Sequence, residues 1–485
     1  MAVEEGSAGR ALMVPARSGL AAAAGAPFAV AVVAYGLLLL VGERLLNDPD
    51  TYWHIAAGRW IWASSAVPTA DPFSHTMAGA PWHAHEWLAE LILAAAYGVA
   101  GWAGVVALAA GAIALSFALL MRALQRVLPA KPALAAVVLA FYLAAGHLTA
   151  RPHALAMPLL VAWSAALLRA RAESRTPRLA LLPLMTLWAN LHGGFVAGLA
   201  LAGFFAVEAV LGAADAGARR RALAGWGRFL AGAAIASLLA PQGIQGWLFP
   251  FRLMRLGAAL DYVAEWHAPD FATFQPLELW LLALLALAFW LRLRVPPPRL
   301  LLLLGIVHLA LVHARDAELL ALLAPLLLAA PVAAGLGSAS APTDAPSRPL
   351  AATAALALAL LTGAAVFIGY PHRNPAIAPM AALAAADKAG LAGPLLNDYD
   401  FGGYLIFTGR HPFVDGRIDL YGEDFMRDYA AAMDAKGDAL PRLLDRYGIA
   451  WTLLKPGTAA AAALDRLPGW ERLYADDTAV VQRRR

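Results

Sequence analysis

The amino-acid sequence predicts an all-α polytopic membrane bundle, followed by a small C-terminal domain that contains both helices and strands. Of the 485 residues, 61% are hydrophobic and only 14% are charged. Apolar runs of about the length needed to cross a bilayer recur along residues 20–369, and the composition turns polar after residue 369. A chain with these three features is an integral membrane protein rather than one large soluble core.

Basic residues between the apolar runs set the predicted topology. Arginine and lysine favour the cytoplasmic side of membrane proteins, and clusters of them follow several of the runs. Placing these clusters inside puts residues 1–19 in the cytoplasm and the C-terminus outside. The eleven predicted spans are residues 20–42, 103–121, 132–149, 154–168, 179–191, 194–212, 226–241, 276–291, 299–314, 317–336 and 350–369.

One further apolar segment, residues 85–101, is not counted as a span. If it crossed the membrane, every later basic cluster would face outward, against the charge bias. We therefore expect a helix that lies at the outer membrane surface or dips into it, with Glu86 and Glu90 at its start. Residues 43–102 then form a long first outer loop.

The polar tail, residues 370–485, is expected to form a small extracytoplasmic α/β domain. Short runs typical of strands, YLIFTG, PFVDGR, WTLLKPG and TAVVQRR, alternate with helical stretches at residues 434–447 and 458–467. The connection at residues 335–349 is rich in small and polar residues, and its composition is typical of a flexible cytoplasmic linker.

The charge balance and the lack of cysteine exclude several classes of function. A net charge of +4 could indicate nucleic acid in a soluble protein, but these basic residues lie between apolar runs, where they orient helices. No nucleic-acid partner is expected. The absence of cysteine excludes a disulfide framework, a thiolate metal site and a cysteine nucleophile.

Polar residues with no part in orientation gather at the predicted outer ends of the helices. They come from separate loops but share one membrane face, so together they predict a functional site there. The candidates are Asp48, Asp50, His54, Asp71, His85, Glu86, Arg151, His153, Asn190, His192 and Arg315.

Two of these candidates, Arg151 and Arg315, depart from the expected distribution of basic residues because they lie outside. A guanidinium fork at headgroup depth suits a phosphate, since it donates paired hydrogen bonds to phosphate oxygens. The alternative for each is an arginine that snorkels or forms a salt bridge, such as Arg315 with Asp316. Several such arginines together favour an anionic, lipid-borne ligand.

The two aspartates after the first span have a functional and a structural interpretation. Pro49 stops the first helix, and Asp50 could simply be the N-cap of the helix that follows. A carboxylate at this boundary could instead act as a general base on an acceptor hydroxyl, or help to hold a divalent ion such as Mg²⁺ or Mn²⁺. The structural interpretation is stronger for Asp50 than for Asp48.

The histidines favour hydrogen bonding over metal binding. His83, His85 and Glu86 could bind a metal ion, but HAHE on a loop lacks the spacing of a helical H-E-x-x-H site. A hydrogen bond to a sugar or phosphate is the preferred interpretation. His192, in WANLHGGFVAG, is presented at the rim beside a tight turn, although a plain interhelical turn explains the same pattern.

The first outer loop resembles the GT-C membrane glycosyltransferases that use polyprenyl-phosphate-linked sugars, in particular protein O-mannosyltransferases and lipid A aminoarabinose transferases. In that branch an acidic motif, D-E-x-x-Y-x-x-I-A, follows the first span. DPDTYWHIA resembles it through Asp48, Tyr52, Ile55 and Ala56. Residues 79–101 have the length and layout of the branch's G-x-P-Y-x-E-K-P-P segment with its amphipathic helix.

The resemblance implies roles for particular residues. Asp48 falls at the position of the catalytic base, His85 lies near a phosphate-contacting position, and the outer arginines match the family's grip on the lipid phosphate. The sequence departs from the pattern at Pro49, which replaces the second acid, and at Asp50, which has no counterpart in the acid pair. These departures leave the donor and the choice of aspartate open.

The whole chain also resembles a group of bacterial membrane proteins with three shared patterns. These are a D-x-D-x-x-W-H loop, an N-L-H-G-G turn and a G-G-Y-L…D-G-R tail. They match DPDTYWH, ANLHGGF, and the tail segments NDYDFGGYLIF and PFVDGR. This grouping identifies no substrate.

The sequence thus predicts a membrane glycosyltransferase. It would move a sugar from a polyprenyl-phosphate donor to a lipid, glycan or protein acceptor at the outer face of the bacterial cytoplasmic membrane. One alternative is a lipid-linked oligosaccharide flippase, which the nearly uncharged span centres disfavour. Another is a non-catalytic glycan-assembly protein whose tail binds glycan or a partner.

Overall fold

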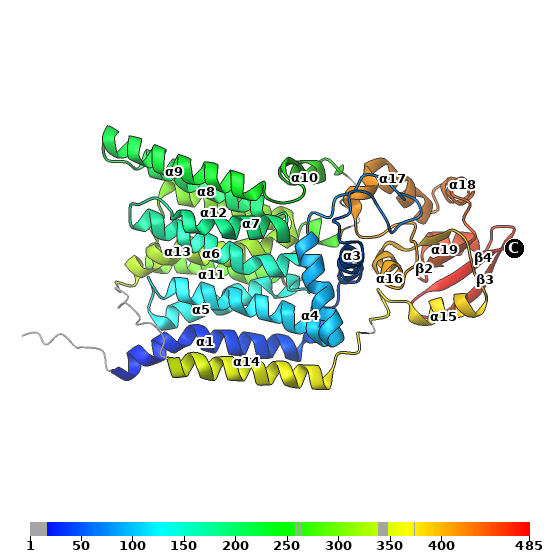
Figure 1. Cartoon of the computed structure of the whole chain (residues 1–485), viewed down its shortest axis with the longest axis horizontal. Coiled ribbons are helices and arrows are strands. Elements are labelled where there is room, and N and C mark those ends of the chain that lie inside the picture. The colour runs from blue at the N-terminus through cyan, green and yellow to red at the C-terminus, as the bar shows by residue number, and fades with distance from the viewer. Residues whose placement is uncertain (1–16, 258–259, 261–262, 338–347, 373) are drawn as a thin grey trace, which may run out of the picture.

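The computed structural model describes residues 17–257, 260, 263–337, 348–372 and 374–485. A bundle of long helices forms one half of the molecule, and a smaller domain of helices and strands sits at one end of it (Figure 1). Most of the N-terminal segment 1–19 and most of the predicted linker 335–349 lie outside the described residues. The predicted fold class, a helical bundle with a small C-terminal α/β domain, is confirmed.

Each of the eleven predicted spans corresponds to a helix of the bundle. Five described helices are long and apolar enough to cross a membrane, judged by length and composition, and five shorter apolar helices accompany them. The bundle helices are α1 (Arg17–Leu40), α4 (Trp87–Leu124), α5 (Ala130–Ala144), α6 (Pro152–Ala172), α7 (Leu182–Leu191), α8 (Phe195–Leu211), α9 (Ala216–Ser237), α11 (Pro276–Leu291), α12 (Pro297–Val312), α13 (Ala317–Gly335) and α14 (Arg348–Ile368).

The boundary of α9 differs most from the prediction. The span was expected at residues 226–241, but the helix begins at Ala216 and ends at Ser237. The Asp215 side chain accepts a hydrogen bond from the backbone N–H of Ala218 at 2.7 Å and so caps the helix start. The cap lets the helix begin before the apolar run, and Arg219–Arg221 lie in its first turns.

Helix α4 consists of two parts. Its backbone leaves the helical conformation at Ala100 and Gly101, where Gly101 has φ 57°. The first part lies across the end of the bundle, and the second part runs along the bundle with the other helices (Figure 1). The segment predicted at residues 85–101 is therefore a helix separate from the span that follows it.

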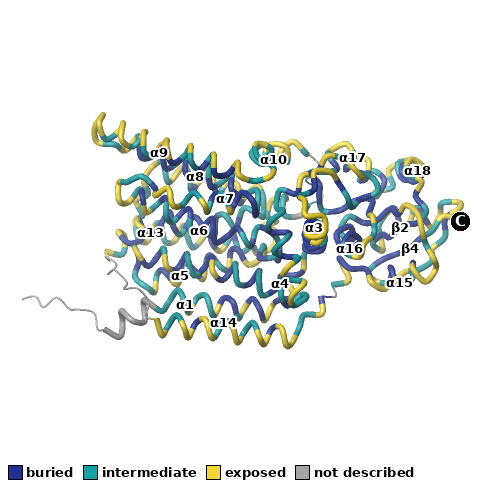
Figure 2. Tube along the Cα trace, in the orientation of Figure 1, coloured by how far each residue is buried: buried dark blue, intermediate teal, exposed yellow. Residues whose placement is uncertain are grey.

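Residues 43–102, predicted as the first outer loop and called by that name below, lie between the bundle and the C-terminal domain. The loop contains α2 (Gly42–Leu45) and α3 (Asp50–Ser64), then irregular chain up to α4. Trp53 and Ala57 of α3 form a buried cluster with Trp82, Ala84 and Ile406, the last of which belongs to the C-terminal domain. Buried residues continue from the centre of the bundle through this loop into the domain (Figure 2).

The C-terminal domain is built on a four-stranded sheet in the order β1-β2-β4-β3. Strand β1 pairs with β2 in parallel, and the β2–β4 and β4–β3 pairs are antiparallel. The strands are β1 (Leu395–Asn397), β2 (Trp451–Leu454), β3 (Trp470–Ala475) and β4 (Val480–Arg484), and the helices are α15 (Met380–Lys388), α16 (Gly402–Phe407), α17 (Ile418–Met433), α18 (Ala439–Arg446) and α19 (Ala459–Leu464).

Two of the four predicted strands are wrong. YLIFTG falls mainly in helix α16, because a short apolar run cannot be told from a buried helix by periodicity. PFVDGR is irregular, because side chains replace the strand partners of its backbone. The N–H of Phe413 donates to Asn397 Oδ1 at 2.7 Å, and Asn397 Nδ2 donates to the carbonyl oxygen of Val414 at 2.8 Å.

Candidate functional site

A cavity of about 450 Å³ lies where the bundle, the first outer loop and the C-terminal domain meet. An apolar part of its wall comes from α6, α8 and α13, with Ala156, Met157, Leu160, Val196 and Leu319 among the lining residues. Another part of the wall is polar. Of the predicted site residues, the structure brings together Asp50, His54, His85, Glu86, Arg151, His153, His192 and Arg315 around this cavity.

A chain of ion pairs crosses the polar wall. Arg151, which precedes α6, contacts Asp50 with its Nη2 atom at 3.0 Å and Asp48 with its Nη1 atom at 3.4 Å. The same Nη1 atom lies 3.0 Å from Glu265, and the other Glu265 oxygen accepts a hydrogen bond from Arg315 at 2.9 Å. Two carboxylates of the first outer loop are thereby linked to two arginines from other loops.

Glu265 and not Asp316 is the carboxylate that Arg315 contacts, so the expected Arg315–Asp316 salt bridge is replaced by a longer-range one. Glu265 lies in the short helix η4 (Ala264–Trp266), and the guanidinium of Arg315 also stacks over the Trp266 ring, 4.7 Å from its centre. Although burial raises the pKa of Glu265, the charges of Arg151 and Arg315 outweigh burial and lower it to about 2.

The structure corrects the expected capping role of Asp50. Helix α3 begins at Asp50, with Pro49 before it, so Asp50 is not its N-cap. Asp48 is the residue whose side chain caps this turn, because its Oδ1 atom accepts a hydrogen bond from the N–H of Asp50 at 2.9 Å. The Asp50 carboxylate lines the cavity, whereas Asp48 contacts Arg151 and is not part of the cavity lining.

Asp50 is held in an environment that favours its protonated form. Burial raises its pKa from 3.8 to about 7, against the opposing charge of Arg151, and the nearby charge of Asp48 adds to the rise. The indole N–H of Trp53 donates to Asp50 Oδ1 at 3.0 Å and fixes the orientation of the carboxyl group. A carboxylate with a pKa near neutrality can both accept and release a proton at physiological pH.

Glycines of the tail allow the C-terminal domain to close over this aspartate. A Cβ atom on Gly416, in the PFVDGR segment, would lie 1.8 Å from Asp50 Oδ1, and one on Gly403 would lie 2.2 Å from the carbonyl oxygen of Pro49. Only glycine permits such close approaches. Both tail patterns therefore pack directly against the NDPD segment.

Glu86 is surrounded by three histidines on another side of the cavity. Its oxygens lie 3.4 Å from His192 and 3.8 Å from both His54 and His85. Burial raises the pKa of Glu86 and lowers the pKa values of His54 and His192. The three imidazoles and the carboxyl group together form a wall of hydrogen-bond donors and acceptors, which suits hydroxyl groups.

The expectation of a divalent metal ion does not fit these residues. Within the part of the chain that the structure describes, no group of three or more His, Asp or Glu side chains is arranged to hold a metal ion. The Arg151 guanidinium already lies between the Asp48 and Asp50 carboxylates, where a cation would have to bind. A metal ion there would also be repelled by the arginine.

Besides Asp48, two predicted site residues are not part of the cavity lining. Asp71 is fully buried in an ion pair with Arg417 of the C-terminal domain, at 2.6 Å. Asn190 accepts a hydrogen bond from Trp87 Nε1 at 2.9 Å and donates to the carbonyl oxygen of Thr186 at 2.8 Å. Asp71 thus ties the outer loop to the domain, and Asn190 ties the first part of α4 to α7.

The structure adds cavity residues that the sequence interpretation did not include. Glu265, Glu318 and Asp419 bring carboxyl groups, and Tyr399 and Arg417 come from the tail. The sequence offers a signal for Glu265, because it is an acid between the spans predicted at residues 226–241 and 276–291, on the same predicted face as Arg151 and Arg315. Arg417 belongs to PFVDGR, which the sequence indicates only as a strand-like run and a shared tail pattern.

Comparison with solved structures places this fold beside known membrane proteins. ArnT from Cupriavidus metallidurans in the apo state matches with a TM-score of 0.52 at 15% sequence identity, over 94% of this chain and 96% of that chain. ArnT bound to undecaprenyl phosphate matches with a TM-score of 0.50 at 15% identity, over 94% and 97%. Archaeal oligosaccharyltransferase AglB from Archaeoglobus fulgidus matches with a TM-score of 0.49 at 11% sequence identity, over 88% of this chain and 69% of that chain.

No protein-family model and no curated protein matches the chain. The likeness to ArnT extends over nearly the whole length of both chains, so it includes the bundle and the C-terminal domain together. The chain is a multi-pass membrane protein with the fold of ArnT, and the expected helical bundle with a small C-terminal domain is confirmed.

Proposed function

We propose that this protein is a membrane glycosyltransferase that moves a sugar from a polyprenyl-phosphate donor to a lipid, glycan or protein acceptor. The observation that carries the proposal is one cavity with three parts: a carboxyl group of near-neutral pKa, two arginines, and an apolar wall that continues into the bundle. The shared fold with ArnT, a lipid A aminoarabinose transferase, which is also known in a form bound to undecaprenyl phosphate, supports it.

Asp50 is the proposed general base. Its carboxylate would take the proton of the acceptor hydroxyl while that oxygen attacks the anomeric carbon of the donor sugar. The bond between the anomeric carbon and the phosphate oxygen breaks, and its electron pair leaves with the polyprenyl phosphate. Attack from the opposite side inverts the anomeric configuration.

Arg315 is the proposed contact for the leaving phosphate. Among the described residues, Arg151 contacts three carboxylates, whereas Arg315 pairs with one and has a more exposed side chain, 31% against 21%. Arg315 is therefore the arginine with free donors for a phosphate, and Arg151 positions Asp50. The wall of Glu86, His54, His85 and His192 would bind sugar hydroxyls, and the polyprenyl tail would lie along α6, α8 and α13.

The proposed orientation places the C-terminal domain outside the bacterial cytoplasmic membrane. The basic clusters on the bundle lie at the end opposite this domain, as the charge bias requires of the cytoplasmic side. The cavity would then open at the outer face, where a lipid-linked donor and an extracytoplasmic acceptor can meet.

The direct test is sugar transfer by the purified protein in liposomes. Undecaprenyl-phosphate sugars would be supplied as donors, with bacterial envelope lipids and glycans as acceptors, and transfer would be measured with radiolabelled sugar. Release of undecaprenyl phosphate together with a labelled product supports the proposal. Absence of both, with protein that still binds undecaprenyl phosphate, would favour a carrier-binding protein without transferase activity.

The transfer rate should depend on the protonation of Asp50. Because the folded-state pKa of Asp50 is about 7, the carboxylate is mostly protonated at pH 6 and mostly ionised at pH 8. A base must be ionised, so kcat/KM should rise about tenfold per pH unit below pH 7 and level off above it. A rate profile that is flat from pH 5 to pH 8 would contradict the assignment.

Replacing Arg315 should weaken donor binding more than turnover at saturation. Losing a charge-assisted hydrogen bond to the phosphate costs about 1.5–3 kcal/mol, so Arg315→Gln should raise the donor KM by roughly 10- to 100-fold. The matched control is Arg252→Gln on α10 (Ile244–Met254), in the same outer loop as Glu265 but outside the cavity lining. An equal KM in both variants would remove Arg315 from the donor site.

A further inference from the structure

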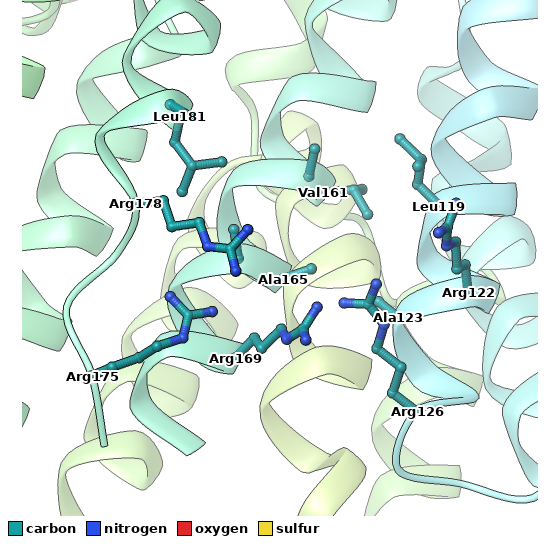
Figure 3. A pocket seen from close by; sticks show the side chains of 13 residues that line it. Leu119, Arg122, Ala123, Arg126, Val161, Ala165, Arg169, Arg175, Arg178 and Leu181 are labelled. Carbon is teal, nitrogen blue, oxygen red and sulfur yellow. The ribbon is translucent and has the colours of Figure 1, made fainter. Parts of the chain in front are cut away.

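A second hollow, of about 320 Å³, lies at the end of the bundle opposite the C-terminal domain. Five arginines surround it: Arg122 and Arg126 from the end of α4, Arg169 from the last turn of α6, and Arg175 and Arg178 from the connection between α6 and α7 (Figure 3). Helix α6 begins next to Arg151, so Arg169 lies about 27 Å further along the helix axis. This hollow is therefore a site distinct from the outer cavity.

Most of the positive charge in this hollow is not neutralised by neighbouring carboxylates. Glu173 pairs with Arg169 at 2.6 Å and also with Arg175. Among the described residues, no acidic side chain lies within ion-pair distance of Arg122, Arg126 or Arg178. Burial and the charges of Arg169 and Arg122 lower the pKa of Arg126, and the opposing charge of Glu173 does not outweigh them.

The hollow also has an apolar side. Leu119, Val161, Ala165 and Leu181 line it next to the arginines (Figure 3). Leu119 lies within one turn of Arg122 toward the middle of α4, and Ala165 lies one turn before Arg169 on α6. The apolar side thus faces the membrane interior, and the guanidinium groups lie at the end of the bundle.

We propose that this hollow binds the phosphate headgroup of an anionic membrane phospholipid, with an acyl chain on the apolar wall. Guanidinium groups donate paired hydrogen bonds to phosphate oxygens, and basic pockets between membrane helices bind acidic lipid headgroups. Arginines that only orient helices in the membrane do not have to surround one shared hollow. Arg219–Arg221 on α9 are such a cluster, since all three side chains are exposed.

The test is a lipid titration of the delipidated full-length protein by native mass spectrometry. Phosphatidylglycerol should bind the native protein, and phosphatidylcholine with the same acyl chains should bind much more weakly. The variant R122Q/R126Q/R178Q should lose phosphatidylglycerol affinity by on the order of 100-fold, because each arginine near a headgroup contributes about a factor of five. The matched control R219Q/R220Q/R221Q removes the same charge elsewhere and should change affinity less than threefold.

A second variant tests the hollow independently of the arginines, and a competing anion tests whether the ligand is a lipid. Ala165→Trp retains all five arginines but fills the apolar side, so it should reduce phosphatidylglycerol binding even if the triple variant folds poorly. Inorganic phosphate should displace the lipid only weakly. Equal lipid affinity in the native protein and in both hollow variants would overturn the proposal, and so would full displacement by inorganic phosphate, which would identify a site for a free anion.

Discussion

Asp50→Asn should lower sugar transfer by about 10²–10⁴-fold, because a general base contributes that much to a proton-transfer step. The replacement has nearly the same shape and can still accept the hydrogen bond from Trp53, which donates to Asp50 Oδ1 at 3.0 Å. It cannot take a proton from the acceptor. Initial rates with an undecaprenyl-phosphate sugar would measure the loss, and a variant with a normal rate would exclude Asp50 as the base.

Asp48→Asn is the matched control for this variant. The Asp48 side chain accepts the hydrogen bond from the N–H of Asp50 at 2.9 Å, and an asparagine oxygen can accept the same bond. Transfer should fall less than tenfold in this variant. If Asp48→Asn were instead the inactive variant and Asp50→Asn the active one, the base would be Asp48, as the family resemblance implied.

The melting temperature of Asp50→Asn shows whether this variant loses activity because it lacks the base or because it is unfolded. The folded-state pKa of Asp50, about 7, lies above the ordinary value of 3.8. The favourable contribution of protonated Asp50 to the free energy of unfolding is therefore complete below pH 3.8, and it is lost as the pH rises to about 7. Asparagine does not ionise, so Asp50→Asn is not destabilised in this way at high pH. The melting temperature of the variant at pH 8 should equal or exceed that of the native protein.

Hydrophobicity and charge placement were enough to predict the bundle from the sequence. Each apolar run must satisfy its backbone inside the membrane, so each becomes a helix, and residues 85–101 were separated from the next span by charge parity alone. The strands were harder to predict. YLIFTG and PFVDGR have the composition of strands, but hydrogen bonds to Asn397 and packing against the outer loop decide their conformation.

The site could be predicted only in part, because its geometry depends on contacts between distant segments. Selecting polar residues at the predicted outer ends of the helices identified eight of the cavity residues, because helix ends on one membrane face lie close together. The sequence favoured Asp50 as the cap and Asp48 as the functional acid, whereas the Asp48 side chain caps the turn and Asp50 lines the cavity, because a cap and a candidate base at a helix start give the same short pattern. Asp71 looked equally suitable, and its partner Arg417 lies 346 residues away.

Arg417→Leu should detach the C-terminal domain from the first outer loop. The Arg417 side chain is fully buried and donates to Asp415 at 2.8 and 2.7 Å and to Asp71 at 2.6 Å. Removing it leaves two buried carboxylates without a counter-charge, which costs about 3–5 kcal/mol. The melting temperature should drop, and transfer should fall with it because the adjacent Gly416 packs on Asp50.

The exposed ion pair of Arg427 with Asp424 on α17 provides the control. Their side chains are 64% and 90% exposed, so Arg427→Leu should leave melting temperature and transfer unchanged. The double variant Asp71→Asn with Arg417→Leu should regain part of the lost stability, because it removes one of the two uncompensated charges. If Arg417→Leu and Arg427→Leu melted alike, the buried pair would not hold the domain over the cavity, and closure over Asp50 would depend on the apolar cluster around Trp53 and Trp82.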